Sequence, residues 1–190
     1  IIRALISTTL FLVSTAAGQD VSYVHRAAGK DVARTTTTRS ERSFRAEGSD
    51  GAGVARLSAV VEYGPDGRVL AYERELRGAG GALVGRVSVS AIDAGARVRE
   101  TGPFGSRTRT APGGAFDVVA DPSFPEGLVP ILEDRERTSF RALIVSEAEV
   151  RPVLIDRRGD GARYVEIPGG DVTVRYDARG VASLSLPGAE

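Results

Sequence analysis

Apolar and polar residues alternate along most of the chain, which is the pattern of β-strands with one buried face. The alternation is most regular at residues 83–92 and near the end of the chain, at 171–177 and 182–186. Similar patterns predict further strands at 21–29, 31–39, 57–63, 68–77, 96–100, 106–110, 116–120, 139–146, 150–156 and 163–167. Short links separate these segments, and the pattern therefore predicts a meander of antiparallel strands.

Glycine-containing turns mark the ends of several predicted strands. GPDG at 64–67 and YDARG at 176–180 each separate two alternating segments. We expect Gly180 to adopt a left-handed conformation, which costs glycine no steric strain. Residues 46–53 contain several glycines and are predicted to form a loop. The threonine run at 35–38 is typical of an edge strand or a solvated strand.

The pattern changes in the sequence DPSFPEGLVPILEDRE at residues 121–136. Ser123 and Glu126 have the spacing of a helix capping box. Leu128, Ile131 and Leu132 follow at helical intervals, while Pro130 limits the helix to one or two turns. We expect this helix at an open end of the sheet. It either plugs the sheet by filling the core or acts as a lid over a cavity, and the pattern leaves both possibilities open.

The first residues indicate export. Arg3 precedes an apolar run at 4–13, and small residues follow at 14–18, which is the pattern of a cleaved signal peptide. The run is shorter than the roughly 20 residues of a membrane-spanning helix. We therefore predict an N-terminal signal helix at residues 1–18, cleaved after Ala17 or Gly18, and a single antiparallel β domain at residues 19–190. The mature protein is expected in the periplasm or outside the cell, with no membrane span.

Amino-acid composition limits the kinds of ligand and catalytic site that the chain can have. The 25 basic and 25 acidic residues balance to a net charge of zero. Such a balance lacks the basic surplus typical of proteins that bind nucleic acid or anionic membranes. The chain has no cysteine and one histidine, His25, which we expect on a strand near a sheet edge. The DRRGDG sequence at 156–161 places Asp156, Asp160 and Gly161 as a calcium loop does, but Arg158 stands where a ligand oxygen is needed and Ile167 where the loop has a glutamate. We predict no metal, no cofactor and no enzymatic activity.

The predicted export signal, FPEGLVPILED at 124–134 and VTVRYDARGVASLSLPG at 172–188 together resemble bacterial exported β-meander families of largely unassigned function, including envelope-integrity proteins. Their curved sheet is similar to the periplasmic lipoprotein-carrier fold. The matching positions are Tyr176, Asp177 and Gly180 in the terminal hairpin, and Phe124, Pro125 and Leu128 in the helical region. The resemblance implies an open or partly closed barrel around a short helix, and it brings no catalytic residue.

Three functions remain as hypotheses. The first is a non-catalytic cell-envelope protein that binds an apolar ligand, such as a lipid, or a partner segment on the concave face of its sheet. The residues expected to line that site are Tyr72, Leu128, Leu132, Phe140 and Tyr176. The second is an interaction scaffold that binds an envelope protein or peptidoglycan through sheet edges, near residues 35–38 or 107–110. The third is a hydrolase based on paired carboxylates.

Overall fold

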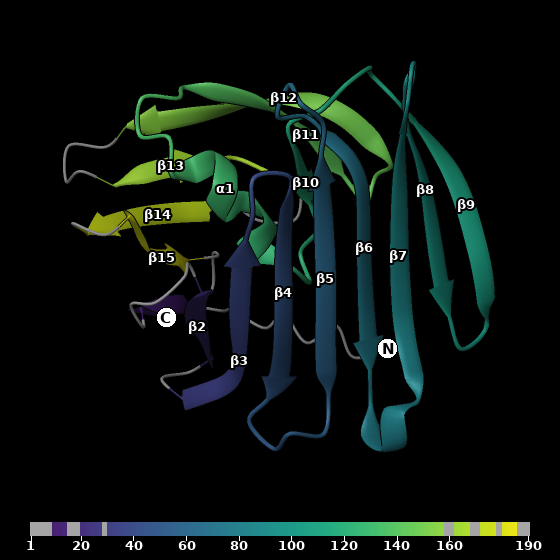
Figure 1. Cartoon of the computed structure of the whole chain (residues 1–190), viewed down its shortest axis with the longest axis vertical. Helices are drawn as coiled ribbons and strands as arrows, with labels where there is room; N and C mark the ends of the chain where they lie inside the picture. The colour runs from purple at the N-terminus through teal and green to yellow at the C-terminus, as the bar shows by residue number, and fades with distance from the viewer. Residues whose placement is uncertain are drawn as a thin grey trace.

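The structure is a computed structural model that describes residues 9–14, 20–27, 30–157, 162–167, 172–177 and 180–185. Within these residues, fifteen strands form one curled sheet (Figure 1). The strands are β1 (Thr9–Ser14), β2 (Asp20–Ala27), β3 (Lys30–Arg39), β4 (Ser43–Asp50), β5 (Arg56–Tyr63), β6 (Val69–Arg77), β7 (Leu83–Ile92), β8 (Gly95–Gly102), β9 (Gly105–Pro112), β10 (Val118–Ala120), β11 (Ser139–Ile144), β12 (Glu149–Arg157), β13 (Arg163–Val165), β14 (Val172–Asp177) and β15 (Gly180–Ser185).

The spatial order of the strands is β10-β11-β12-β13-β14-β15-β1-β2-β3-β4-β5-β6-β7-β8-β9. Neighbouring strands pair antiparallel except β10 and β11, which are parallel. Among the described strands, the β15–β1 pairing alone joins strands that do not follow each other in sequence. The mainly β fold and the curled antiparallel meander predicted from the sequence are confirmed.

One local prediction was wrong, and of a second, that of an edge strand or a solvated strand, the edge is excluded. Residues 46–53 were expected to form a loop, but most of them belong to β4. Gly48 is needed there because a Cβ atom would lie 2.8 Å from Oγ1 of Thr35 on β3. The threonine strand is not an edge, since β3 pairs with β2 and β4. Thr35 and Thr37 are buried, whereas their neighbours in sequence face solvent.

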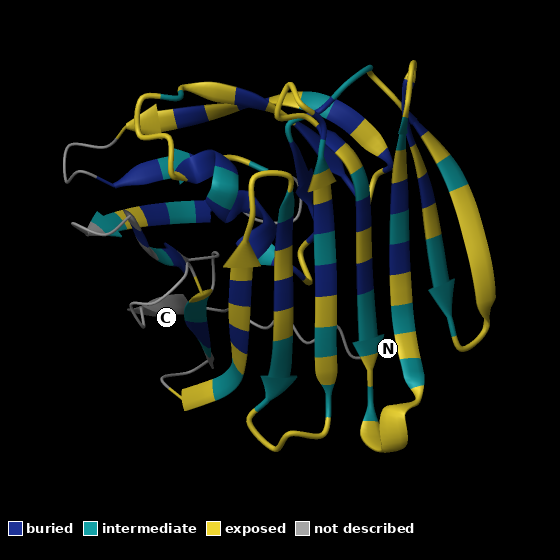
Figure 2. Cartoon of the chain, viewed as in Figure 1, coloured by how far each residue is buried: buried dark blue, intermediate teal, exposed yellow. Residues whose placement is uncertain are grey.

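The inner face of the sheet packs into two hydrophobic cores, visible as the dark bands in Figure 2. The first core lies mainly among β10–β15 and consists of Tyr23, Val118, Ala120, Leu128, Val129, Ile131, Leu132, Phe140, Ala142, Ile144, Val153, Ile155, Val165, Val172, Val174, Val181 and Leu184. The second core lies mainly under β4–β9 and consists of Phe44, Ala46, Ala59, Val61, Val69, Tyr72, Val87, Val89, Ala96, Val98, Ala111, Phe116, Val119, Phe124, Leu143, Val145, Ala148 and Val150.

The parallel strands β10 and β11 form the wall between the two cores. On β10, Val118 and Ala120 face the first core while Val119 faces the second. On β11, Ile144 faces the first core and Leu143 the second. Both faces of the pair are therefore buried, which is the usual environment of parallel strands.

The two ends of the sheet approach each other. Nη1 and Nη2 of Arg109 on β9 donate hydrogen bonds to the carbonyl oxygens of Ser146 (3.0 Å) and Val145 (2.8 Å), which follow β11. Gly113 lies so close to β12 that a Cβ atom would be 2.5 Å from the carbonyl oxygen of Val150. These contacts bring edge strand β9 against β12 and partly close the sheet into a half-barrel.

At both ends of the chain, a prediction from the sequence concerns residues that the structure does not describe. Of the predicted signal helix at residues 1–18, the structure describes Thr9–Ser14 alone, and that segment is strand β1, paired with β2. The turn of the terminal hairpin at 178–179 also lies outside the described residues, and the left-handed conformation of Gly180 stays a prediction. Among the described residues, no helix has the length and apolar character needed to cross a membrane.

Candidate functional site

A short helical segment fills the interior of the first core. It consists of a 3₁₀ turn, η2 (Pro125–Leu128), and one turn of α-helix, α1 (Val129–Leu132). Figure 1 shows it on the inner side of the curled sheet. Leu128, Ile131 and Leu132 are buried in the first core, as the helical spacing predicts for a plug. The predicted capping box is wrong, because no side-chain hydrogen bond caps η2 and its N-cap residue is Phe124.

The five residues expected to bind an apolar ligand do not form one site. Leu128, Leu132 and Phe140 lie in the first core with 0–3% of their surface exposed, and Tyr176 packs against that core. Tyr72 lies in the second core, where its ring stacks on Phe124 with centroids 6.1 Å apart. The structure thus uses these side chains as packing partners of the helical segment.

Tyr176 attaches the end of the helix to the sheet. Its hydroxyl donates a hydrogen bond to the carbonyl oxygen of Leu132 at 2.8 Å. The same hydroxyl accepts one from Nη1 of Arg163, at 3.1 Å, and this nitrogen also donates to the carbonyl oxygen of Asp134 at 2.8 Å. Carbonyl groups at a helix end have no partner within the helix, and the bond from Tyr176 satisfies that of Leu132.

A buried ion pair attaches the link between β10 and η2 to β6. Asp121 Oδ2 accepts hydrogen bonds from Nε of Arg74 at 2.8 Å and from the hydroxyl of Tyr72 at 3.0 Å. All three residues are buried. Burial raises the pKa of Tyr72, and the charge of Asp121 raises it further. Burial alone would lower the pKa of Arg74, but Asp121 and Tyr72 outweigh it and raise that pKa. The group is therefore a neutral phenol beside a fixed ion pair.

A second buried acid faces β2. Glu126, in η2, is fully buried, and its Oε1 lies 2.7 Å from Nε2 of His25. The same nitrogen is 2.8 Å from Oγ1 of Thr35. The expectation that His25 lies near a sheet edge is wrong, since β2 pairs on both sides. Burial, with smaller contributions from Glu133 and Glu126, raises the pKa of the adjacent Tyr23.

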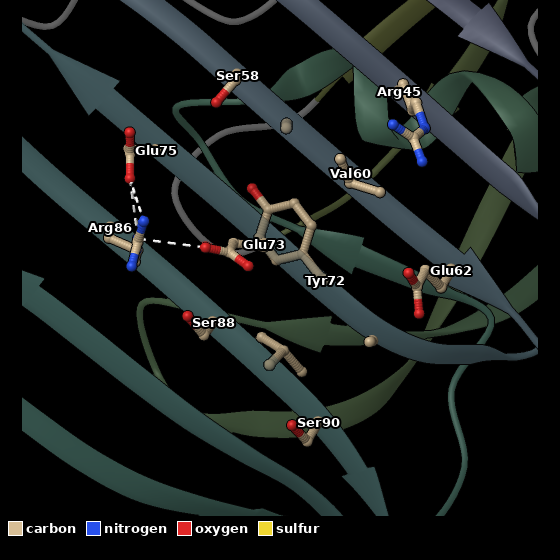
Figure 3. A pocket seen from close by; sticks show the side chains of 13 residues that line it. Arg45, Ser58, Val60, Glu62, Tyr72, Glu73, Glu75, Arg86, Ser88 and Ser90 are labelled. Carbon is tan, nitrogen blue, oxygen red and sulfur yellow. Dashed lines mark hydrogen bonds and ion pairs between the residues drawn. The ribbon is translucent and has the colours of Figure 1, made fainter.

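The outer face of β4–β7 carries an open groove of about 590 Å³ (Figure 3). Its floor includes the small residues Ser58, Ala71, Ser88 and Ser90, and its sides carry Arg45, Glu62, Glu73, Glu75 and Arg86. Arg86 forms ion pairs with Glu73 (3.2 Å) and Glu75. Hydrogen bonds from Arg77 and Arg86 lower the pKa of Glu75. Among the described residues, Arg45 and Glu62 have no ion-pair partner, and so both remain available to a ligand.

Sequence reasoning missed the buried acids and this groove. Asp121 and Glu126 occur in a segment rich in proline and glycine, where carboxylates usually face solvent. Their apolar neighbours, Val118–Ala120 and Leu128–Leu132, were the available signal that this segment is buried. The groove could not be read from one strand, because its residues come from four strands.

Comparison with known proteins gives one structural match. No protein-family model and no curated protein matches the chain. A crystal structure of a DUF1089 family protein from Pseudomonas aeruginosa is similar, with a TM-score of 0.48 and 14% sequence identity over 94% of this chain and 97% of that chain.

Among the described residues, no group of three or more histidine, aspartate or glutamate side chains is arranged to hold a metal ion.

Proposed function

We propose that this chain is a non-catalytic, exported protein of the bacterial cell envelope that binds a partner through the outer face of its sheet. The observation that carries the proposal is the packing of the inner face. Leu132 is fully buried, and its carbonyl oxygen is bonded to Tyr176. An apolar ligand on the inner face would have to displace the helical segment together with its buried ion pair to β6. The interaction scaffold is therefore favoured over the carrier.

The groove supports a polar partner. Its serine hydroxyls can both donate and accept hydrogen bonds, and its unpaired groups, Arg45 and Glu62, carry opposite charges. Residues 45 and 62 lie on adjacent strands, at diagonal positions of the β4–β5 register. A segment that presents a carboxylate and an amine at similar spacing, such as an extended peptide, complements this arrangement.

The acids of the molecule favour a binding role over hydrolysis. A general acid needs a pKa close to the working pH, and this requires raising the pKa of a carboxyl group. In the groove, Arg77 and Arg86 lower the pKa of Glu75 instead. Glu126 and His25 resemble an acid–base pair, but Glu126 has no exposed surface through which a substrate could reach it.

The partner-binding proposal is tested by charge reversal in the groove. The full chain is isolated by gentle extraction, and the retained molecules are identified by mass spectrometry. We expect a stable protein partner with the wild type and its loss with Arg45→Glu. Arg97→Glu, which changes an exposed arginine on β8 outside the groove, serves as the matched control. Co-purified lipid without protein, combined with uptake of a fluorescent fatty acid, would instead support the carrier.

Export is tested separately by intact-mass measurement. We expect the exported protein to begin at Gly18 or Gln19, as the small residues before this point predict. Cleavage at that point would remove β1, which lies between β15 and β2. A protein that retains residues 1–17 would contradict the export signal and leave the sheet as described.

A further inference from the structure

The two ends of the β3–β9 meander have opposite character. At one end the connections are residues 40–42, 64–68 and 93–94, and each contains an acidic residue: Glu41, Asp66 and Asp93. At the other end the connections are 51–55, 78–82 and 103–104, with the sequences GAGVA, GAGGA and PF. None of these three connections contains a charged, hydroxyl or amide side chain. We refer to the three, together with Val84, as the hairpin-tip end.

The hairpin-tip end is a continuous surface, at the lower end of the meander in Figure 1. Residues of the first two connections, including Val54 and Ala79, line one open hollow of about 430 Å³. Val84 reaches back over Gly78, where a Cβ atom would lie 3.2 Å from Cγ2 of Val84. The backbone of Val84 is in turn close to Gly102, which leads into the third connection.

Large apolar side chains project from this surface. Phe104 is fully exposed, and about half of the surface of Val54 and of Val84 is exposed. In Figure 2 these connections are coloured mostly as exposed, whereas several of the strand ends that lead into them are coloured as intermediate. Positive φ angles explain glycines such as Gly53 and Gly80, but turn geometry does not require phenylalanine or valine at the neighbouring positions.

Arginines surround the apolar tips. Arg56 and Arg77 are directly opposite each other in the β5–β6 register, and both line the hollow. Like charges at such positions repel each other unless an anion lies between them. Arg77 bonds to Glu75 and to the carbonyl oxygen of Gly81, whereas Arg56 and Arg107 have no ion-pair partner among the described residues. Glu75 is therefore the acid paired with Arg77, while Asp50, which precedes the first connection, accepts a hydrogen bond from the backbone N–H of Val54 at 2.7 Å.

We propose that the hairpin-tip end docks on an anionic lipid membrane, with Phe104, Val54 and Val84 entering the interface and a lipid phosphate held between Arg56 and Arg77. Exposed apolar tips with arginines beside them follow the pattern of interfacial membrane binding. A protein partner would need hydrogen-bonding groups for specificity, and the three connections offer only backbone groups. The zero net charge of the chain does not oppose docking, because the charges are separated by location.

This inference goes beyond the proposed function and does not depend on it, because the groove and the tips are different surfaces. The test is flotation of the full chain with vesicles, either of phosphatidylcholine alone or of equal parts phosphatidylcholine and phosphatidylglycerol. We expect binding to the anionic vesicles that weakens as salt is added. Phe104→Ala should weaken it about tenfold, and Leu154→Ala, which removes another exposed apolar side chain, on β12, should leave it unchanged.

Arg56→Gln separates the electrostatic contribution to vesicle binding from the apolar contribution. This variant should reduce the preference for phosphatidylglycerol while keeping the thermal unfolding midpoint of the wild type. Absence of vesicle binding overturns the proposal, and so does binding that both variants leave unchanged. Binding of inorganic phosphate without vesicle binding also overturns it and indicates a simple anion site. Loss of the groove's partner with Arg45→Glu while vesicle binding persists separates this result from the proposed function.

Discussion

The two cores of the sheet are filled in different ways. In the first core, the strands curl around α1, and large aliphatic residues from the helix fill the interior. In the second core, alanines recur on neighbouring strands, at Ala46, Ala59, Ala96 and Ala111. These small side chains leave room for Phe116 and Phe124 to reach the sheet. The first core thus depends on an inserted segment, and the second on close approach between β10–β11 and the meander.

The comparison also shows why the helical segment needs polar contacts. Asp121 is bonded to Tyr72 of the second core and to Arg74, and Glu126 lies against His25 beside the first core. The stretch from Asp121 to Glu126 therefore contacts both cores, one through each acid. Buried charges cost desolvation energy, but they specify one arrangement where apolar packing alone would allow several.

The largest expected effect comes from breaking the contact to the second core. Asp121→Ala leaves Arg74 buried without its partner and should lower the free energy of unfolding by about 3–5 kcal/mol. Urea unfolding measures this, with Glu41→Ala at an exposed turn as control. Adding Arg74→Leu to Asp121→Ala should recover much of the loss. If it does not, the cost arises from packing and not from the unpaired charge.

Truncation in the first core should cost nearly as much. Leu132→Ala opens a cavity beside the helix and should lower the free energy of unfolding by about 2–5 kcal/mol. Leu70→Ala is the matched control, because Leu70 is about half exposed at a bulge of β6. An equal, small effect of both variants would show that the helix is a mobile lid instead of a plug.

Disturbing the contact that closes the half-barrel should lower the free energy of unfolding by less than either of these two substitutions. Gly113 has φ of +125°, and a Cβ atom would lie 2.5 Å from the carbonyl oxygen of Val150. Gly113→Ala should therefore cost about 1–3 kcal/mol, measured by thermal or urea unfolding. Gly53 also has a positive φ, but nothing lies within 4 Å of a Cβ atom at that position. Gly53→Ala is therefore the matched control. The difference between the two variants isolates the contact between β9 and β12.

The smallest effect at neutral pH is expected for Tyr63→Phe, within about 0.5 kcal/mol. Burial, with a smaller contribution from Glu133, raises the pKa of Tyr63 to about 12, although Arg39 opposes the shift. A raised pKa in the folded state stabilises the fold below the unfolded value of about 10, and this stabilisation is lost as pH rises from 10 to 12. Between pH 10 and 12, the unfolding midpoint should therefore fall less for Tyr63→Phe than for the wild type. An equal fall in both proteins would contradict the assignment of this pH dependence to Tyr63.

Most strands could be predicted because their side chains alternate between a buried and an exposed face. Residues 83–92 coincide with β7, and the GPDG turn at 64–67 was also predicted. β4 was missed because its glycine and serine indicate a turn, whereas Gly48 is required by contact with Thr35 on a neighbouring strand. Asp121 is bonded to residues of β6, and His25, which lies beside Glu126, belongs to β2. A pattern along one segment contains no information about such distant contacts.

In a chain that retains its first residues, the order of strands has a consequence for synthesis. β9 and β10, consecutive in sequence, form the two edges of the sheet, while β1 and β15 pair in its interior. Hairpins β2 to β9 can form as they emerge from the ribosome, since each pairs with its immediate neighbour. One side of β1 must wait for β15, the last described strand. Until that strand has emerged, β1 exposes an unpaired edge, and during this interval the nascent chain is most vulnerable to pairing with another molecule.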